Sequence, residues 1–256
     1  MAKRKSNLPA RYKDGLWLTK DNRLIGLHGS MTPLNYKLTN YFLLLAAKTG
    51  RLHNLEAHAT ELARILKIKS TNVNGILLAE SKRIPKNTVD IQDINDPEKV
   101  ISLSIIPIMS YNHGTLIATV NPMLEKYISS LAGSFTKENI ALLNECSIYP
   151  AMRLYEVCLS WMRTGIAYFS VDEWRSLLGA TKKSYTVFAH FKHWVLSPAI
   201  NEVNAKTDLV LEPEFVKQGR ITTHVRMHIT KKTLTDASVL DNSEADTFVN
   251  TDLGKH

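Results

Sequence analysis

The clearest pattern of apolar and polar positions lies between residues 170 and 203, where two apolar helical stripes flank a short polar turn. Ser170 and Glu173 stand at the spacing of a capping box, in which each side chain bonds a backbone N–H of the first helical turn. Gly179 is placed to end this helix in the left-handed conformation. Apolar positions three and four residues apart then predict a second helix over residues 185–203. Together they are typical of a helix-turn-helix unit.

An alternating pattern follows this unit. Residues 221–229 switch between apolar and polar side chains at every step, which is the period of a half-buried strand. Residues 208–212 predict its partner, and Gly219 lies in a basic turn where a hairpin requires positive φ. A helix-turn-helix followed by a basic hairpin is a winged helix, in which the helix reads base edges and the hairpin, or wing, holds the adjacent phosphates.

The first half of the chain predicts the same order of elements with negligible sequence similarity to the second. Asn54 is expected to cap the second of its helices, and Thr136 and Asn139 are candidate caps further on. Over the chain before residue 170, the expected helices cover residues 33–48, 55–67, 73–83, 123–131 and 149–163, and the expected strands cover 16–18, 100–109, 116–120 and 167–169. Because the order of three helices and a hairpin recurs without sequence similarity, the repeat is architectural.

We predict an α+β, mainly helical fold with two tandem winged-helix domains. The expected divisions are a basic N-terminal arm (1–31), a first winged helix for dimerisation or DNA contact (32–134), a linker helix or junction (135–147), a second, DNA-binding winged helix (148–232) and an acidic, disordered tail (233–256).

Composition narrows the choice of partner. The 256 residues are 44% apolar and carry a formal net charge of +8, which favours an anionic partner such as nucleic acid or a membrane surface. A basic protein without such a partner fits the charge equally well. Cys146 and Cys158 imply neither a disulfide framework nor a thiolate metal site, and a reducing cytoplasm is expected. No apolar run is long enough to cross a bilayer, and no hydrophobic segment follows the basic N-terminus as in a secretory signal.

Residues from about 120 to 229 resemble the Rep superfamily of plasmid replication initiators, the iteron-binding class typified by RepE, RepA and π. The stretches that carry the resemblance are Asn121-Pro122-Met123-Leu124 with Tyr127, Gly133-Ser134-Phe135-Thr136, Arg153-Leu154-Tyr155-Glu156, residues 169–179, residues 191–204, Lys206-Thr207-Asp208-Leu209 and Lys217-Gln218-Gly219-Arg220. Each is weak alone, but their order and spacing are specific. The first domain resembles the family in architecture and only loosely in sequence.

This resemblance implies a function. The family is built of two winged helices, its monomers bind origin repeats (iterons) and promote opening of a nearby A·T-rich segment, and its dimers often repress the initiator's own promoter. It also implies a host initiator ATPase and a replicative helicase as partners. Many relatives are richer in arginine around the recognition helix than this chain, so bidentate arginine readout of guanine is expected to be less used here.

The candidate DNA contacts are polar and basic residues around the two predicted helix-turn-helix units and the wing. In the second domain they are Lys182, Lys183, Ser184, Thr186, His190, Lys192, His193, Lys217, Arg220 and Thr222. In the first domain they are Lys69, Thr71, Asn72 and Asn74, where a solvated helix face without DNA contact fits equally well.

Other chemistry is disfavoured. His224, Arg226 and His228 share one face of a strand, but no carboxylate or cysteine accompanies them at ligand spacing, so we expect no metal site and no cofactor. A nicking enzyme needs a His-x-His pair and a nucleophilic tyrosine, and a nucleotide-driven enzyme needs a phosphate loop; neither pattern is present. We therefore expect no enzyme, and the alternatives are a winged-helix repressor or a nicking relaxase. Three tryptophans are expected in the core, namely Trp161, Trp174 and Trp194.

Overall fold

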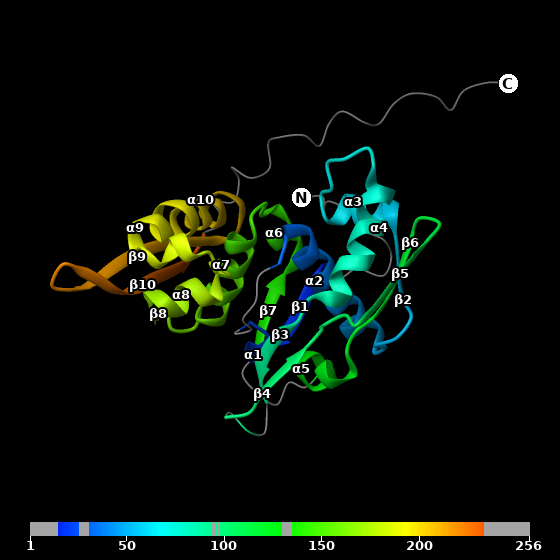
Figure 1. Ribbon diagram of the computed structural model, residues 1–256, viewed down its shortest axis with the longest axis horizontal. Coiled ribbons are helices and arrows are strands. Elements are labelled where there is room, and N and C mark those ends of the chain that lie inside the picture. The colour runs from blue at the N-terminus through cyan, green and yellow to red at the C-terminus, as the bar shows by residue number, and fades with distance from the viewer. Residues whose placement is uncertain (1–14, 26–30, 94–95, 97, 130–134, 233–256) are drawn as a thin grey trace, which may run out of the picture.

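The chain folds into two winged helices that share one junction. The computed structural model describes residues 15–25, 31–93, 96, 98–129 and 135–232. The outer part of the expected arm (1–14) and the expected acidic tail (233–256) lie outside the described residues. In Figure 1 the second winged helix is on the left, the first is on the right, and strands β1 and β7 run side by side between them.

The second winged helix has the order helix, strand, two helices and hairpin. Its elements are α7 (Tyr149–Ser160), β8 (Ile166–Ser170), α8 (Val171–Leu177), η4 (Lys183–Thr186), α9 (Phe188–Phe191), the π-helical η5 (Lys192–Leu196), α10 (Ser197–Lys206), β9 (Leu209–Gln218) and β10 (Ile221–Lys231). The three strands form an antiparallel sheet in the order β8-β10-β9.

The predicted start and end of α8 are confirmed. Ser170 accepts a hydrogen bond from the backbone N–H of Glu173, and the Glu173 carboxylate accepts from the backbone N–H of Ser170 at 2.7 Å. Gly179 follows the helix with φ +67°. Trp174 is fully buried and donates from Nε1 to the carbonyl oxygen of Val225 at 3.0 Å, which ties α8 to the central strand of the sheet.

The predicted helix over residues 185–203 has different ends. Tyr185 lies in the 3₁₀ turn η4, and Val187 has extended backbone angles (φ −75°, ψ 118°) that separate this turn from the helix. Helical structure then runs continuously through α9, η5 and α10 to Lys206, with one π-helical stretch in its middle. We call residues 188–206 the recognition helix.

The predicted hairpin is confirmed and is longer than expected. The first strand was expected over residues 208–212, but β9 continues through Pro213 to Gln218. Proline lacks an N–H for a sheet ladder, and it fits here because β9 is an edge strand that pairs only with β10. We call the β9–β10 hairpin the wing, and it extends beyond the helices at the left of Figure 1.

The first winged helix repeats this order with an insertion. Its elements are α2 (Pro33–Thr49), β2 (Leu55–His58), α3 (Ala59–Ile65), α4 (Val73–Arg83), η2 (Ile84–Lys86), β3 (Val89–Gln92), β4 (Val100–Leu103), β5 (Ile108–Asn112) and β6 (Thr115–Thr119). Its sheet has the order β2-β6-β5, so in both domains the strand after the first helix pairs with the last strand. The predicted architectural repeat is therefore present, with the β3–β4 pair inserted in the first copy.

Two predictions in the first domain were wrong. Asn54 does not cap a helix: it has φ +52° and leads into β2, because Leu55 and Ala57 are buried while Glu56 and His58 are exposed, as in a strand. The expected strand over residues 100–109 is split into β4 and β5, which belong to different sheets.

The expected arm and linker also fold differently. β1 (Trp17–Asp21) and α1 (Asn22–Ile25) belong to the first domain, since β1 pairs along its full length with β7 (Phe135–Asn139). Thr136 therefore lies inside a strand and caps nothing, whereas Asn139 does cap α6 (Ile140–Glu145). Two short elements precede β7, η3 (Pro122–Leu124) and α5 (Glu125–Ser129).

A buried charge network joins the two domains. Lys20 of β1 makes ion pairs with Glu138 (2.8 Å) and with Glu156 of α7 (2.6 Å). Arg153 of α7 pairs with Glu156 at 2.9 Å and donates to the Tyr36 hydroxyl at 2.8 Å. All five side chains are almost completely buried. Because an isolated buried charge is very costly, these groups stabilise the fold only as a complete set.

Candidate nucleic-acid interface

The outer face of the recognition helix is polar and basic. Its inner positions, Phe191, Val195, Leu196, Ala199, Ile200 and Val203, are buried in the core of the second domain. The predicted contacts Thr186, His190, Lys192 and His193 are all exposed. Residues 174–201 contain no aspartate or glutamate, so this stretch presents only neutral and positive side chains. Such a face attracts a polyanion such as the DNA backbone.

Arg175 of α8 holds the turn before the recognition helix in place. Its guanidinium donates to the carbonyl oxygen of Thr186 at 2.7 Å and lies over the ring of Phe191 at 5.6 Å. The Nδ1 atom of His190 lies 3.1 Å from the carbonyl oxygen of Ser184. Because a carbonyl oxygen only accepts, Nδ1 carries the proton, and Nε2 is directed away from this bond. These contacts fix the turn that contains Lys182, Lys183 and Ser184, which are all exposed.

Lys192 lies where the recognition helix meets the wing. Its ammonium sits 4.3 Å from the ring centre of Phe215 on β9, which is cation–π distance. Phe188 packs edge-on against the same ring, with centroids 5.7 Å apart. The helix and the wing are therefore held in one relative position, with a positive charge between them.

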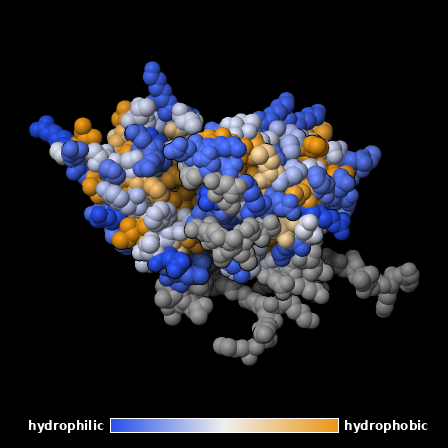
Figure 2. All heavy atoms as spheres, turned by 90° about the horizontal axis from the view of Figure 1, so that it is seen from below, coloured by the Kyte–Doolittle hydropathy of each residue, from blue (hydrophilic) through white to orange (hydrophobic). Residues whose placement is uncertain are grey.

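The end of the wing carries three predicted contacts. Gly219 has φ +63° and forms the tight turn, which places Lys217 and Arg220 on either side of it, both exposed. Thr222 follows, and a β-bulge between Thr222 and His224 increases the local twist of the hairpin. Figure 2 shows hydrophilic side chains at the far left end of the molecule, where the wing ends in Figure 1.

A cluster on the outer face of the sheet contains a carboxylate. No carboxylate stands at ligand spacing from Arg226 and His228 in the sequence, but Glu214 of the neighbouring strand β9 bonds both, at 2.9 Å and 3.2 Å. Hydrogen bonds from His228 and Arg226 lower the pKa of the Glu214 carboxyl. Among the described residues, no three His, Cys, Asp or Glu side chains gather closely enough to hold a metal ion.

The first domain offers a smaller surface. Lys69, Thr71 and Asn74 are exposed around the start of α4. Asn72 has a different role, because its Oδ1 accepts from the backbone N–H of Gly75 at 3.1 Å and so caps the helix. DNA contact by these residues stays a prediction, with Asn72 contributing through the shape of the turn.

The tryptophans divide into core and surface. Trp174 is in the core as predicted. Trp161 and Trp194 were predicted wrongly, since they are 40% and 65% exposed. Trp194 lies on the recognition helix among the candidate contacts. It lies in the π-helical stretch η5, a wide turn that leaves no simple mark in the sequence.

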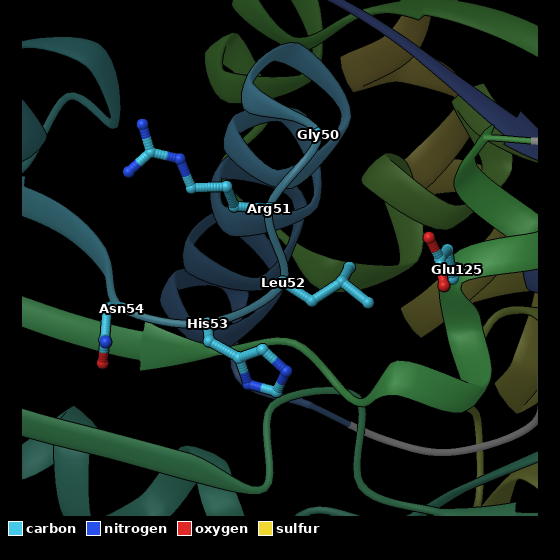
Figure 3. A pocket seen from close by; sticks show the side chains of 6 residues that line it. All are labelled: Gly50, Arg51, Leu52, His53, Asn54 and Glu125. Atoms are coloured by element: carbon cyan, nitrogen blue, oxygen red, sulfur yellow. The ribbon is translucent and has the colours of Figure 1, made fainter.

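A shallow pocket lies away from these surfaces. Figure 3 shows its lining, where the chain leaves α2 at Gly50 and passes the start of α5. Leu52 points towards Glu125 across the pocket, whereas the Arg51 side chain points out of it. Its sides come from separate loops with little convergent chemistry, so it defines no site.

Several residues of the family-like stretches hold the frame. Glu202 accepts from the backbone N–H groups of Ser147 and Ile148 at 3.0 and 3.1 Å, where α7 begins. Asn204 bonds both the N–H (2.7 Å) and the carbonyl oxygen (3.0 Å) of Leu211 on β9. The recognition helix is thereby fixed to α7 on one side and to the wing on the other.

The fold defines a double winged-helix protein. Residues 17–159 match the family described as "Initiator Replication protein, WH1", and residues 170–229 match "Initiator Rep protein, WH2". The chain belongs to this family of replication initiators, and the predicted resemblance and fold class are confirmed.

Two solved structures are similar. One is the Pi initiator protein in complex with iteron DNA, with 21% identity and a TM-score of 0.66 over 85% of this chain and 98% of that one. The other comprises domains 2 and 3 of RctB, with 13% identity and a TM-score of 0.46 over 76% of this chain and 81% of that one. The first supports the two-domain fold. Within the described residues, no helix is long and apolar enough to cross a membrane.

Proposed function

We propose that this initiator binds repeated double-stranded sequences in a plasmid origin, and that its second winged helix is the principal reader. The observation that carries this proposal is the acid-free, exposed face of the recognition helix beside a long basic wing. The helix would enter the major groove, and Lys217 and Arg220 would hold phosphates alongside it. The Pi protein, bound to iteron DNA on a similar fold, supports the same arrangement.

In this proposal the protein acts through binding energy and has no catalytic centre or cofactor. Lysine and arginine contacts to phosphates supply affinity that falls with salt, and a few base contacts supply sequence choice. Binding of several repeats would then favour opening of the adjacent A·T-rich segment and recruitment of a host initiator ATPase and helicase in the cytoplasm.

The first domain is proposed to mediate self-association or to add a further DNA contact. Its exposed apolar side chains support the first role, among them Val100 of β4, Ile108 of β5 and Met123 of η3. A dimer formed in this way would compete with the monomer that binds the repeats, and it could repress the initiator's own promoter.

Binding to duplexes that carry a repeat found near the coding region tests the reader function. We expect the repeat to bind more tightly than scrambled duplex of the same length at physiological salt. Equal affinity for both would refute the proposal. A second experiment separates an initiator from a repressor: a plasmid that carries only the origin is tested for replication with the protein supplied in trans. If the protein binds the repeat specifically but the plasmid does not replicate, the protein is a repressor without an initiator role.

A further inference from the structure

Trp194 is a large, exposed aromatic side chain among the candidate DNA contacts of the recognition helix. It is 65% exposed, although Trp174 in the same domain is fully buried. Its immediate neighbours, Lys192 and His193, are exposed as well, and the next two residues turn inward to the core. These residues form the π-helical stretch η5. Such wide turns are frequent at functional sites, because they direct side chains where a regular α-helix would not.

Trp194 is one of three exposed residues at and after the start of the recognition helix. Val187 is the extended residue just before the helix, and His190 of α9 and Trp194 of η5 follow it at spacings of three and four residues. Val187 is 50% exposed and His190 is exposed too. Two exposed apolar side chains therefore come before and after a hydrogen-bonding one in the segment proposed to enter the groove.

The indole has a defined orientation. The ring of His193 packs edge-on against it, with centroids 4.5 Å apart and an interplanar angle of 87°. A supported ring loses less conformational freedom on binding than a loose side chain does. An isolated exposed apolar residue needs no explanation in general. Here, however, it stands among lysines and histidines, in a stretch of 28 residues (174–201) without an acidic side chain, which favours a polyanionic partner over an apolar protein surface.

The apolar group that a major groove offers is the C5-methyl of thymine, since the other base edges there present hydrogen-bond donors and acceptors. We infer that Trp194 is a specificity-determining residue that packs its indole against a thymine methyl group in the origin repeat. This inference rests on the proposed function and adds to it the base, thymine, that Trp194 selects.

Replacing thymine by uracil removes only that methyl group and keeps base pairing. Each thymine of the repeat would be replaced in turn, and affinity measured for the wild type, Trp194→Ala, Trp194→Phe and the control Trp161→Ala, which removes an exposed tryptophan outside the recognition helix. One replacement is expected to weaken the wild type about fourfold, the equivalent of one buried methyl group. Trp194→Ala is expected to lose at least about tenfold in affinity for the repeat.

The decisive result is the combination of the two changes. Trp194→Ala should bind the thymine and uracil duplexes equally, Trp194→Phe should keep part of the difference, and Trp161→Ala should keep all of it. If Trp194→Ala retains the full difference, or if no uracil replacement weakens the wild type, the inference is wrong although repeat binding stands. A changed oligomeric state in Trp194→Ala with unchanged DNA affinity would assign the indole to a protein contact and also overturn it. If the wild type shows no preference for the repeat, the proposed function and this inference fail together.

Discussion

The two winged helices share one topology but present different surfaces. In the second, the recognition helix spans residues 188–206, and the wing has strands of 10 and 11 residues. In the first, α4 has 11 residues and its hairpin strands have 5 each. The two copies therefore share an order of elements and differ in the lengths of the helix and of the wing. In the proposed function, this difference makes the second copy the principal reader.

Buried and half-buried charged side chains attach the elements of the second winged helix to one another and to the first domain. α7 and the recognition helix are linked by Glu202, and α7 is linked to the first domain by Arg153 and Glu156. Charged residues of the family-like stretches therefore include members of the frame, such as Arg153, Glu156 and Glu202, as well as proposed DNA contacts, such as Lys192 and Arg220.

The largest expected effect concerns the junction between the copies. Arg153→Met should lower the free energy of unfolding by about 3 to 5 kcal/mol, because it leaves the buried Glu156 carboxylate short of a partner. Chemical denaturation followed by circular dichroism measures this. Arg226→Met is the control, since its pair with Glu214 is solvent-exposed and should contribute about 1 kcal/mol or less. Equal losses in the two variants would contradict the proposed role of the junction.

The same junction predicts a pH dependence. Burial alone would raise the pKa of Glu156, but Lys20 and Arg153 outweigh it and lower the pKa to about 2. An unfolded glutamate takes up its proton near 4.5, so this carboxylate adds stability above that pH and loses it progressively between about pH 4.5 and 2.

Between pH 2 and 4.5, the free energy of unfolding should therefore rise more steeply with pH for the wild type than for Glu156→Gln. The difference in slope corresponds to the one proton that Glu156 binds in the unfolded state but not in the folded state. The pKa of Glu138 is raised by burial and by the Glu156 charge, so its contribution has the opposite sign and falls as pH rises above 4.5. Identical slopes for wild type and Glu156→Gln below pH 4.5 would show that Glu156 is not held ionised.

The smallest expected effect comes from replacing the glycine in each of the two hairpin turns. Gly219 of the wing and Gly114 of the first hairpin have φ of +63° and +82°, and an added Cβ meets no atom within 4 Å at either site. Changing either glycine to alanine should therefore cost about 1 kcal/mol of stability from backbone strain alone. DNA affinity should fall only for Gly219→Ala, because its turn positions Arg220. An equal fall for Gly114→Ala would place both hairpins on the DNA.

The sequence predicted some parts of this structure well. Ser170, Glu173 and Gly179 make local hydrogen bonds and turns, so their signal is contained in a few adjacent residues. Asn54 misled because the stretch after it fits a helix by composition, and only pairing with β6 decides for a strand.

Other parts of the structure depend on contacts between residues that lie far apart in the sequence. Lys20 meets Glu156 across 136 residues, which no local pattern reveals. The exposed face of the recognition helix was predicted correctly at His190, Lys192 and His193. The exposure of Trp194 was not predicted, because a large apolar side chain is more often buried than exposed, and the π-helical turn that contains it has no local signal in the sequence.

The central claim is that the second winged helix makes the principal phosphate contacts. Affinity for the repeat should be measured against salt for the wild type, for Lys192→Ala/Arg220→Ala, and for the matched first-domain pair Lys69→Ala/Lys82→Ala. Lys82 is an exposed lysine in the last turn of α4. We expect the second-domain pair to lose about tenfold or more in affinity, and its slope of log K against log salt to fall by about 0.9 for each lost contact. The first-domain pair should change both quantities less. An unchanged slope in the second-domain pair, or a larger change in the first-domain pair, would contradict the account.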